Sequence, residues 1–314
     1  MAKATIGKGV KTKTTWANAL KRDWQLYLLL MIPVALVVIF NYASYGGIRM
    51  VFMDYKPAKG YAGSKWVGWA TFQKVFKDKD FIRALKSSIV FNLLDLAVGF
   101  PMPIILALIL NELRFPRFKK VTQTILYLPH FLSWVVLAMI FRDLLDGSGI
   151  INSGLMALGI IKEPIVFLGN NSWFQGLMIG TDVWKEFGYG AIIFIAALTS
   201  INTELYEAAA IDGAGRLQRI WHITLPGIAV TIVLVATLNI ANILNAGFDQ
   251  IYNLYSPIVY STGDIIDTYV YRMSFENAQY SLATAIGLLK SLVSFILIVV
   301  SNFCAGKFAN YRIF

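Results

Sequence analysis

The sequence predicts an all-α integral membrane protein with six membrane-spanning helices. Apolar residues make up 57% of the 314 residues and charged residues 15%, against roughly 45–50% and about 25% in soluble proteins. Mean hydropathy is +0.61. Apolar runs recur at the length of about 20 residues that a helix needs to cross a bilayer. The 24 Gly, 9 Pro and single Cys exclude a collagen-like chain and a disulfide scaffold.

The six predicted spans are separated by charged loops. The first run is read as a retained span, because its basic leader is longer than that of a signal peptide and five more runs follow. Asp95 interrupts the second run and Lys290 the sixth, and the fourth holds three ionisable residues. The predicted spans are 25–48, 87–111, 121–141, 173–199, 223–248 and 281–303.

Basic residues in the tails and loops indicate the orientation of the chain, whose net charge is +10. With the N-terminus inside, the inner segments hold 14 Lys and Arg and the outer loops 12, nine of them between Arg49 and Lys86. This excess favours a cytoplasmic N-terminus weakly, and six spans then place the C-terminus on the same side. We expect a basic cytoplasmic tail, 1–24, followed by a six-helix domain, 25–314. The basic clusters should meet anionic membrane lipid and not nucleic acid.

Sequence motifs for catalysis are scarce. The two histidines, His130 and His222, are 92 residues apart without an HExxH or CxxC pattern, so no metal site is expected. His130 is expected to pack between helices and His222 to be solvated. The phosphate-binding pattern GxxxxGK[ST] is absent, so energy from a nucleotide would come from another chain.

The segment between the fourth and fifth spans has the pattern of a short helix and a sharp turn. Thr203 is a candidate N-cap, and acidic residues in the first turn would complement the helix dipole. Alanines at 208–210 leave almost no side chain, which allows another backbone to approach closely. Gly213 and Gly215 would then end the helix and turn the chain. Such a short helix, held at the membrane face by two spans, fits a cleft on a partner protein.

This segment, EAAAIDGAGRLQRIWHITLP, resembles the EAA motif of binding-protein-dependent ABC importer permeases, in which E-A-A precedes a glycine turn and I-x-L-P. Thr231 departs from the pattern, because many members have a second proline there. The stretches MVFMDYKPAKG, PMPIILALILNELRF, YLPHFLSWVV and DIIDTYVYR resemble the carbohydrate-uptake branch, and within it permeases for aldouronate, rhamnogalacturonan or alginate fragments. The matching motif residues are Glu207, Ala208, Ala209, Asp212, Gly213, Ala214, Ile223, Leu225 and Pro226.

The resemblance implies the type I ABC importer permease fold (MetI-like) and a non-catalytic subunit that translocates an oligosaccharide, with an acidic one possible. Its implied partners are a second similar permease, two ABC ATPase subunits and an extracytoplasmic solute-binding protein, in the cytoplasmic membrane of a bacterium. ATP and Mg²⁺ would be bound by the ATPases, so this chain needs no cofactor. The loop at about 203–224 would be the coupling helix that docks on the ATPase, through Glu207, Ala208, Ala209, Asp212 and Gly213.

Polar residues of the fourth span are candidates for the sugar path, because polar groups that face lipid are costly. Asp182, Lys185, Glu186 and Tyr189 follow the i, i+3, i+4, i+7 spacing of one helical face. A purely structural ion pair of Lys185 with Asp182 and with a sequence neighbour is the alternative. Lys185 is compatible with an acidic sugar and equally with a local neutraliser.

Three amides of the fifth span, Asn239, Asn242 and Asn245, extend the candidate path. Amides hydrogen-bond sugar hydroxyls, but they also hold membrane helices together. In the resembled family this helix pair lines the sugar cavity, which favours the path. The lone charges Asp95 and Lys290 are interpreted first as structural.

Two other functions stay open. An ATPase-independent secondary transporter would show inverted repeats, which are not apparent, and would leave the motif loop unexplained. A membrane-embedded enzyme acting on lipid-linked sugars would need clustered acids, for which Asp264 and Asp267 are the nearest candidates. No neighbouring group in the sequence would activate a nucleophile there.

Overall fold

The computed structural model describes residues 16–308, which form two compact units divided between Met50 and Val51. The segments 1–15 and 309–314 lie outside the described residues, and with them most of the predicted basic tail and the C-terminus. Each unit is therefore described by itself.

The first unit is the first predicted span. Helix α1 (Trp16–Val37) continues through a π-helical turn, η1 (Val38–Tyr42), into the 3₁₀ helix η2 (Ala43–Phe52). The continuous helical stretch Leu20–Phe52 is long and apolar enough to cross a membrane, which confirms the span predicted at 25–48.

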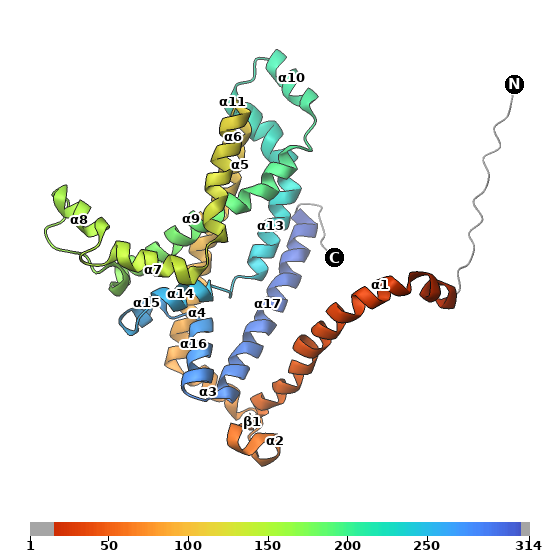
Figure 1. The fold of residues 1–314 in the computed structure, drawn as a ribbon, viewed down its shortest axis with the longest axis vertical. Helices are drawn as coiled ribbons and strands as arrows, with labels where there is room; N and C mark the ends of the chain where they lie inside the picture. The colour runs from red at the N-terminus through yellow and green to blue at the C-terminus, as the bar shows by residue number, and fades with distance from the viewer. Residues whose placement is uncertain (1–15, 309–314) are drawn as a thin grey trace. The chain divides into compact units, whose positions relative to one another are not determined.

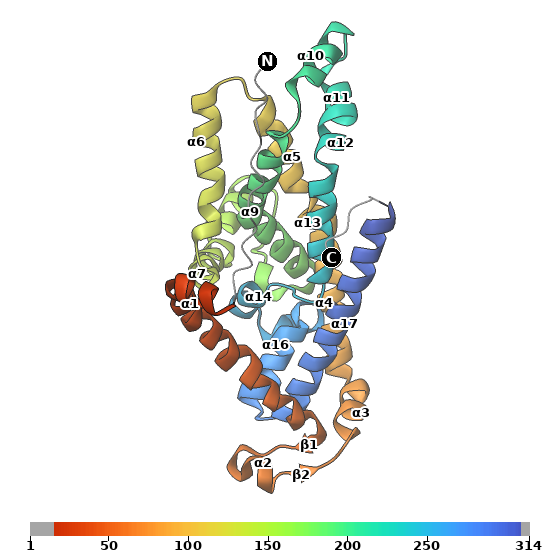
Figure 2. The ribbon, with the colours of Figure 1, turned by 90° about the vertical axis from the view of Figure 1, so that its right-hand side faces the viewer.

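The second unit is built around the long helix α9 (Asn171–Leu198), which contacts α4, α5, α6, α13, α14 and α15. Helices α5, α6, α10 and α11 lie towards one end of this unit and α3 and α16 towards the other (Figure 1). Helix α17 runs beside α13 in both ribbon views (Figures 1 and 2). The long helices besides α9 are α4 (Lys79–Val98), α5 (Pro101–Glu112), α6 (Pro116–Tyr127), α7 (Trp134–Leu145), α13 (Ala229–Ala241) and α17 (Tyr280–Phe308).

Short elements connect these helices. Strand β1 pairs antiparallel with β2, with Met53 opposite Trp66. The short elements are β1 (Met53–Asp54), η3 (Pro57–Lys59), α2 (Gly60–Gly63), β2 (Lys65–Trp66), α3 (Ala70–Lys77), η4 (Leu128–Phe131), α8 (Ile150–Ala157), η5 (Phe167–Gly169), α10 (Thr203–Ile211), α11 (Arg216–Arg219), η6 (Ile220–Thr224), α12 (Leu225–Gly227), α14 (Phe248–Leu254), η7 (Pro257–Val259), α15 (Tyr260–Gly263), α16 (Ile266–Tyr271) and η8 (Arg272–Glu276).

The six predicted spans correspond to three long helices and three bent helix pairs in the described part of the chain. The three single stretches are Leu20–Phe52, Lys79–Glu112 and Tyr280–Lys307. The bent pairs begin at Pro116, Asn171 and Arg216, with bends of 97°, 78° and 63°. The all-α, six-span architecture is thus confirmed, with bends that hydropathy does not reveal.

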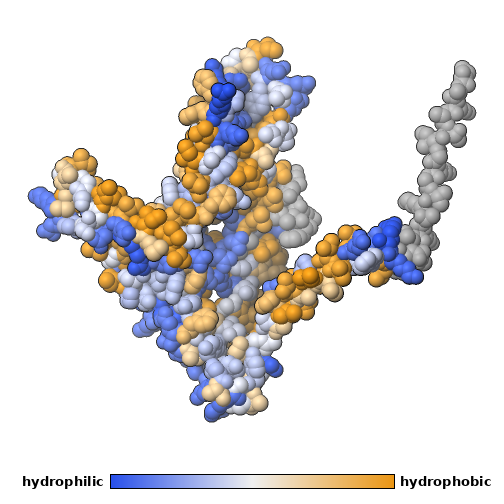
Figure 3. Space-filling view, viewed as in Figure 1, coloured by the Kyte–Doolittle hydropathy of each residue, from blue (hydrophilic) through white to orange (hydrophobic). Residues whose placement is uncertain are grey.

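The third predicted span, 121–141, is sharply bent in the structure. Helix α6 and its extension η4 end at Phe131, and α7 begins at Trp134 with its axis turned by 97°. Pro129 lies in η4 and lacks the N–H that would continue an α-helix. Ser133 is extended and caps α7, its Oγ accepting from the Val136 N–H at 3.3 Å. Figure 3 shows apolar side chains gathered along α7 beyond this break.

The fifth predicted span, 223–248, is also shorter as a helix. Helix α13 ends at Ala241, and the chain continues without regular helix to Gly247, whose φ of 67° is left-handed. Asn242 closes the helix end, its amide donating to the Leu238 carbonyl at 3.1 Å. Because the Asn242 amide hydrogen-bonds the last turn of α13, the helix can end at Ala241 although the apolar run continues to Phe248.

Three apolar clusters are distributed along the second unit. One surrounds Tyr269 and Phe81, the second surrounds Phe174 and Ile251, and the third is formed by α5 and α9 around Phe194. The second and third clusters pack α9 against its neighbours. The polar cavities described below border the second and third clusters.

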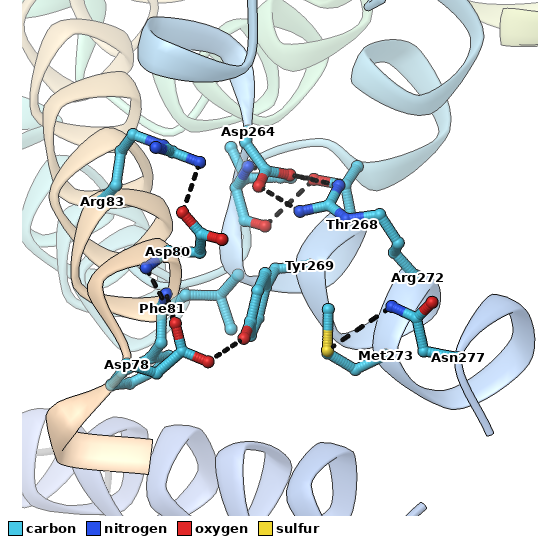
Figure 4. Close-up of polar contacts among 12 residues, drawn as sticks. Asp78, Asp80, Phe81, Arg83, Asp264, Thr268, Tyr269, Arg272, Met273 and Asn277 are labelled. Carbon is cyan, nitrogen blue, oxygen red and sulfur yellow. Dashed lines mark hydrogen bonds and ion pairs between the residues drawn. The ribbon is translucent and has the colours of Figure 1, made fainter. Parts of the chain in front are cut away.

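A network of ion pairs secures the segment that follows α15 (Figure 4). Asp264 is fully buried and accepts hydrogen bonds from Arg272 Nη2 at 2.6 Å and Arg272 Nη1 at 3.1 Å. Tyr269 donates to Asp78 at 2.6 Å, which ties α16 to the start of α4. Lys290 of α17 donates to Asp267. Lys290, which the sequence analysis interprets as structural, therefore has an ion-pair partner. Asp264 and Asp267, the two acids considered for catalysis, both take part in ion pairs.

Candidate functional site

Three neighbouring cavities lie among α4, α9, α13 and the segment after α13. Their volumes are about 750, 410 and 370 Å³. All three are lined by Asp95 of α4, so they meet at this residue. If residue 99 were alanine, its methyl group would lie 2.3 Å from Asp95 Oδ1. Gly99, one helical turn after Asp95, therefore leaves room for the carboxylate.

Six of the seven predicted path residues line these cavities. The largest cavity brings Asp182, Glu186 and Tyr189 of α9 together with Asn239 of α13. The second is lined by Asn239, Asn242 and Asn245. The predicted helical face of α9 and the amide row therefore face a common space, although Asn242 and Asn245 belong to the irregular segment after α13.

Lys185 is the predicted residue that lines none of these cavities. It is 6% exposed, and its Nζ donates to Glu186 Oε1 at 2.7 Å and to the His130 carbonyl at 3.0 Å. The structural ion pair is thus formed with the sequence neighbour Glu186 and not with Asp182. An ammonium that is satisfied in this way neutralises a carboxylate and is not presented to the cavities.

His130, which lies in η4 just before the bend between α6 and α7, completes this cluster. Its Nδ1 lies 2.7 Å from Glu186 Oε2, and since a carboxylate oxygen accepts, Nδ1 carries the proton. Its ring stacks on Tyr189 with centroids 3.8 Å apart and planes 3° from parallel. The prediction that His130 packs between helices is confirmed, and the packing reaches two cavity-lining residues.

Sequence reasoning missed Asp95 as a cavity residue. Its side chain, like that of Asp182, makes no hydrogen bond or ion pair within the described residues, whereas Glu186 has two partners. An acid inside a predicted span is itself a signal for function. Gln250 of α14 also lines the smallest cavity, where its amide donates to the Met178 carbonyl at 2.8 Å.

The motif loop forms the predicted short helix, α10, with a different cap. Asn202 and not Thr203 is the N-cap, because the Asn202 side chain accepts from the Glu204 N–H at 3.0 Å. The Thr203 prediction is wrong by one residue, since both residue types favour this position and sequence alone does not separate them.

The end of α10 is a Schellman turn. The Ala214 N–H donates to the Ala209 carbonyl at 2.8 Å and the Gly213 N–H to the Ala210 carbonyl at 3.2 Å. Gly213 has a φ of 78°, which favours glycine. The predicted turn is confirmed at Gly213, and Gly215 instead begins α11 with ordinary dihedral angles.

Helix α10 has no buried residue, although it is fixed at both ends of its hairpin. The Tyr206 hydroxyl lies 3.0 Å from Thr224 Oγ1, and Arg216 stands 4.0 Å from Glu112 at the end of α5. Ile211 is 86% exposed. The hollow between α10 and the following helix, about 580 Å³, is lined by Ala209, Asp212, Gly213, Ala214, Gln218, Arg219, His222 and Ile223.

The exposed apolar residues of this hairpin define a surface that a partner protein could cover. Of the predicted coupling residues, Glu207, Ala208, Asp212 and Gly213 are exposed and Ala209 is half-buried. The described residues contain no group of three or more His, Cys, Asp or Glu side chains able to hold a metal ion.

This combination of bent spans, a polar cavity among them and an exposed hairpin defines a membrane transport subunit. Residues 99–308 match the family model "Binding-protein-dependent transport system inner membrane component". The chain belongs to this family of transport permeases, which are membrane components of importers and not enzymes.

Two curated relatives and one solved structure agree with this family. Protein LplB of Bacillus subtilis (strain 168) is 43% identical over 311 residues, 99% of this chain and 96% of LplB. The polygalacturonan/rhamnogalacturonan transport system permease protein YteP of the same organism is 40% identical over 312 residues, covering 99% and 96%. A chain of the bacterial alginate ABC transporter, solved in complex with an alginate pentasaccharide-bound periplasmic protein, aligns with a TM-score of 0.86 at 36% identity over 95% and 99% of the two chains.

Proposed function

We propose that this permease carries an oligosaccharide released from a polysaccharide through the cavities around Asp95. The observation that carries the proposal is the convergence of carboxylates, amides and aromatic rings on a common space between membrane helices. Carboxylates and amides hydrogen-bond hydroxyl groups, and aromatic faces pack on sugar rings. The similarity to permeases for galacturonan, rhamnogalacturonan and alginate supports the substrate class.

The charges of the cavities indicate how an acidic fragment would be oriented. Asp95 and Asp182 are carboxylates without a cation partner in the described residues, and the one lysine nearby, Lys185, is turned away. In their ionised form these acids would repel uronate carboxylates. We therefore propose that this chain contacts the hydroxyl groups of the sugar and that the partner permease contacts its uronate carboxylates.

The remaining parts of the importer are proposed on the same basis. The exposed helix α10 is the docking element for an ABC ATPase, two copies of which bind ATP and Mg²⁺ and hydrolyse the nucleotide. A second permease completes the membrane path, and an extracytoplasmic binding protein delivers the sugar. The hairpin is then cytoplasmic, as are both termini, and the chain itself needs no cofactor.

Uptake by the assembled importer in proteoliposomes tests this proposal. Alginate pentasaccharide, a rhamnogalacturonan fragment and a neutral galactooligosaccharide would be offered with the binding protein and with ATP inside the vesicles. Asn242→Leu should lower uptake or change the preferred sugar, and Glu207→Ala should abolish uptake, while both variants still insert. Normal rates and an unchanged sugar preference in Asn242→Leu would remove Asn242 from the path. Normal uptake by Glu207→Ala would contradict the docking role of α10.

A further inference from the structure

We propose that His130 is a positioning residue that sets the orientation of Tyr189 and Glu186 towards the sugar path. This inference rests on the proposed function, because it assigns to those two residues a role in the largest of the three cavities around Asp95. His130 itself lies behind them and does not line that cavity.

The turn η4, at the bend between α6 and α7, places His130 against the middle of α9. Residues 128–131 form one tight turn between α6 and α7, whose axes differ by 97°. Helix α6 approaches α9 so closely that a methyl group at Gly188 would stand 2.0 Å from the Leu126 carbonyl oxygen. The turn is therefore held at a fixed height on α9.

Three contacts join His130 to α9, and each constrains a different group. Its ring covers one face of Tyr189 at 3.8 Å and nearly parallel. Its Nδ1 proton is donated to Glu186 Oε2 at 2.7 Å, and its carbonyl accepts from the buried Lys185 Nζ at 3.0 Å. The Phe131 ring packs edge-on against both rings of this stack, with its centroid 5.5 Å from that of His130 and 6.2 Å from that of Tyr189.

These contacts restrict Tyr189 and Glu186 without closing the cavity. Tyr189 is 44% exposed, so the stacked ring still presents surface to the space that it shares with Asn239. Glu186 is held by one cation and one imidazole, which fixes the direction of its carboxylate. A pre-oriented aromatic ring and acceptor lower the ordering cost of sugar binding.

The inference predicts which substitutions recover function. His130→Ala removes both the stacking and the hydrogen bond, which together correspond to a loss of turnover of about tenfold. His130→Phe keeps a flat ring against Tyr189 and should recover part of that loss. Leu128→Ala, on an exposed side chain of the same turn, is the matched control and should leave uptake unchanged.

The test is a double-mutant cycle of His130→Ala and Tyr189→Ala in the reconstituted importer, with alginate pentasaccharide and a neutral galactooligosaccharide as probes. Turnover is measured at saturating loaded binding protein, and copurified ATPase reports assembly. We expect the double variant to be no slower than the slower single variant, with assembly intact. Multiplying losses, or an unchanged His130→Ala, would overturn the inference. Absence of ATP-dependent uptake by the wild-type importer would instead contradict the proposed function.

Discussion

Asp264 is the clearest case of a single residue on which local structure depends. Its carboxylate is fully buried and is satisfied by both nitrogens of Arg272 and by the Thr268 hydroxyl (Figure 4). Arg272 also lies 4.5 Å from the centroid of the Tyr260 ring. Removing one partner of a buried pair leaves the other charge uncompensated.

Asp264→Ala should therefore destabilise the chain by about 3–5 kcal/mol. Asp80→Ala is the control, because its pair with Arg83 at 2.8 Å is solvent-exposed and such pairs contribute about 1 kcal/mol or less. Thermal unfolding of the two purified variants in the same detergent measures both. Similar midpoints for the two would show that the Asp264 pair does not hold the segment after α15.

Residue identity alone predicted some of these roles and not others. The amides and acids of the fourth and fifth spans could be found because polar groups in apolar runs are costly. The carboxylate that pairs with Lys185 could not be predicted, since Glu186 at i+1 and Asp182 at i−3 are equally available from sequence. Only the packing of η4 against α9 decides that Glu186 receives this lysine.

At the scale of one element, the end of α10 depends on a single backbone conformation. Gly213 has a φ of 78°, which costs a non-glycine residue roughly 1–2 kcal/mol. Gly215, two residues later, has a φ of −68°, which alanine adopts freely. The two glycines therefore form a matched pair for testing the turn.

Gly213→Ala should lower ATP-dependent uptake, whereas Gly215→Ala should leave it close to wild type. An alanine at 213 shifts the hairpin away from its native turn and so changes the surface proposed for the ATPase. Uptake and the yield of copurified ATPase would be measured for both variants at equal membrane insertion. Equal behaviour of the two would show that the turn geometry is not needed for coupling.

The contact of α9 with α6 provides a second prediction for an element. Gly188→Ala should destabilise the chain by about 1–3 kcal/mol, because its methyl group meets the Leu126 carbonyl oxygen at 2.0 Å. Gly180→Ala, on the same helix with open space around it, should be neutral or slightly stabilising. Thermal unfolding of both variants checks this, and an undiminished midpoint in Gly188→Ala would contradict the close approach.

Elements differed in how well sequence predicted them. The span at 173–199 matches α9 within two residues, because its apolar face and polar face alternate at helical period. The helices within the spans at 121–141 and 223–248 are interrupted at Ser133 and Asn242, where side chains cap helix ends inside apolar runs. Hydropathy measures transfer into lipid and carries no information on such caps.

At the scale of the whole molecule, a polar path among the candidate membrane helices is combined with an exposed helix, α10. The two sites are linked by α9 and by the bent segment from α11 to α13, which flank the hairpin at both ends. Motion imposed on α10 by a partner would therefore reach the helices that line the cavities. This linkage makes the ATPase the central requirement of the proposed transport.

Purification of the chain from its native membrane, with identification of what accompanies it by mass spectrometry, tests this requirement most directly. We expect a second six-helix permease and an ABC ATPase to be recovered with it, and Glu207→Ala to reduce recovery of the ATPase. A monodisperse chain that lacks both partners and still supports uptake would contradict the account and favour an ATPase-independent transporter.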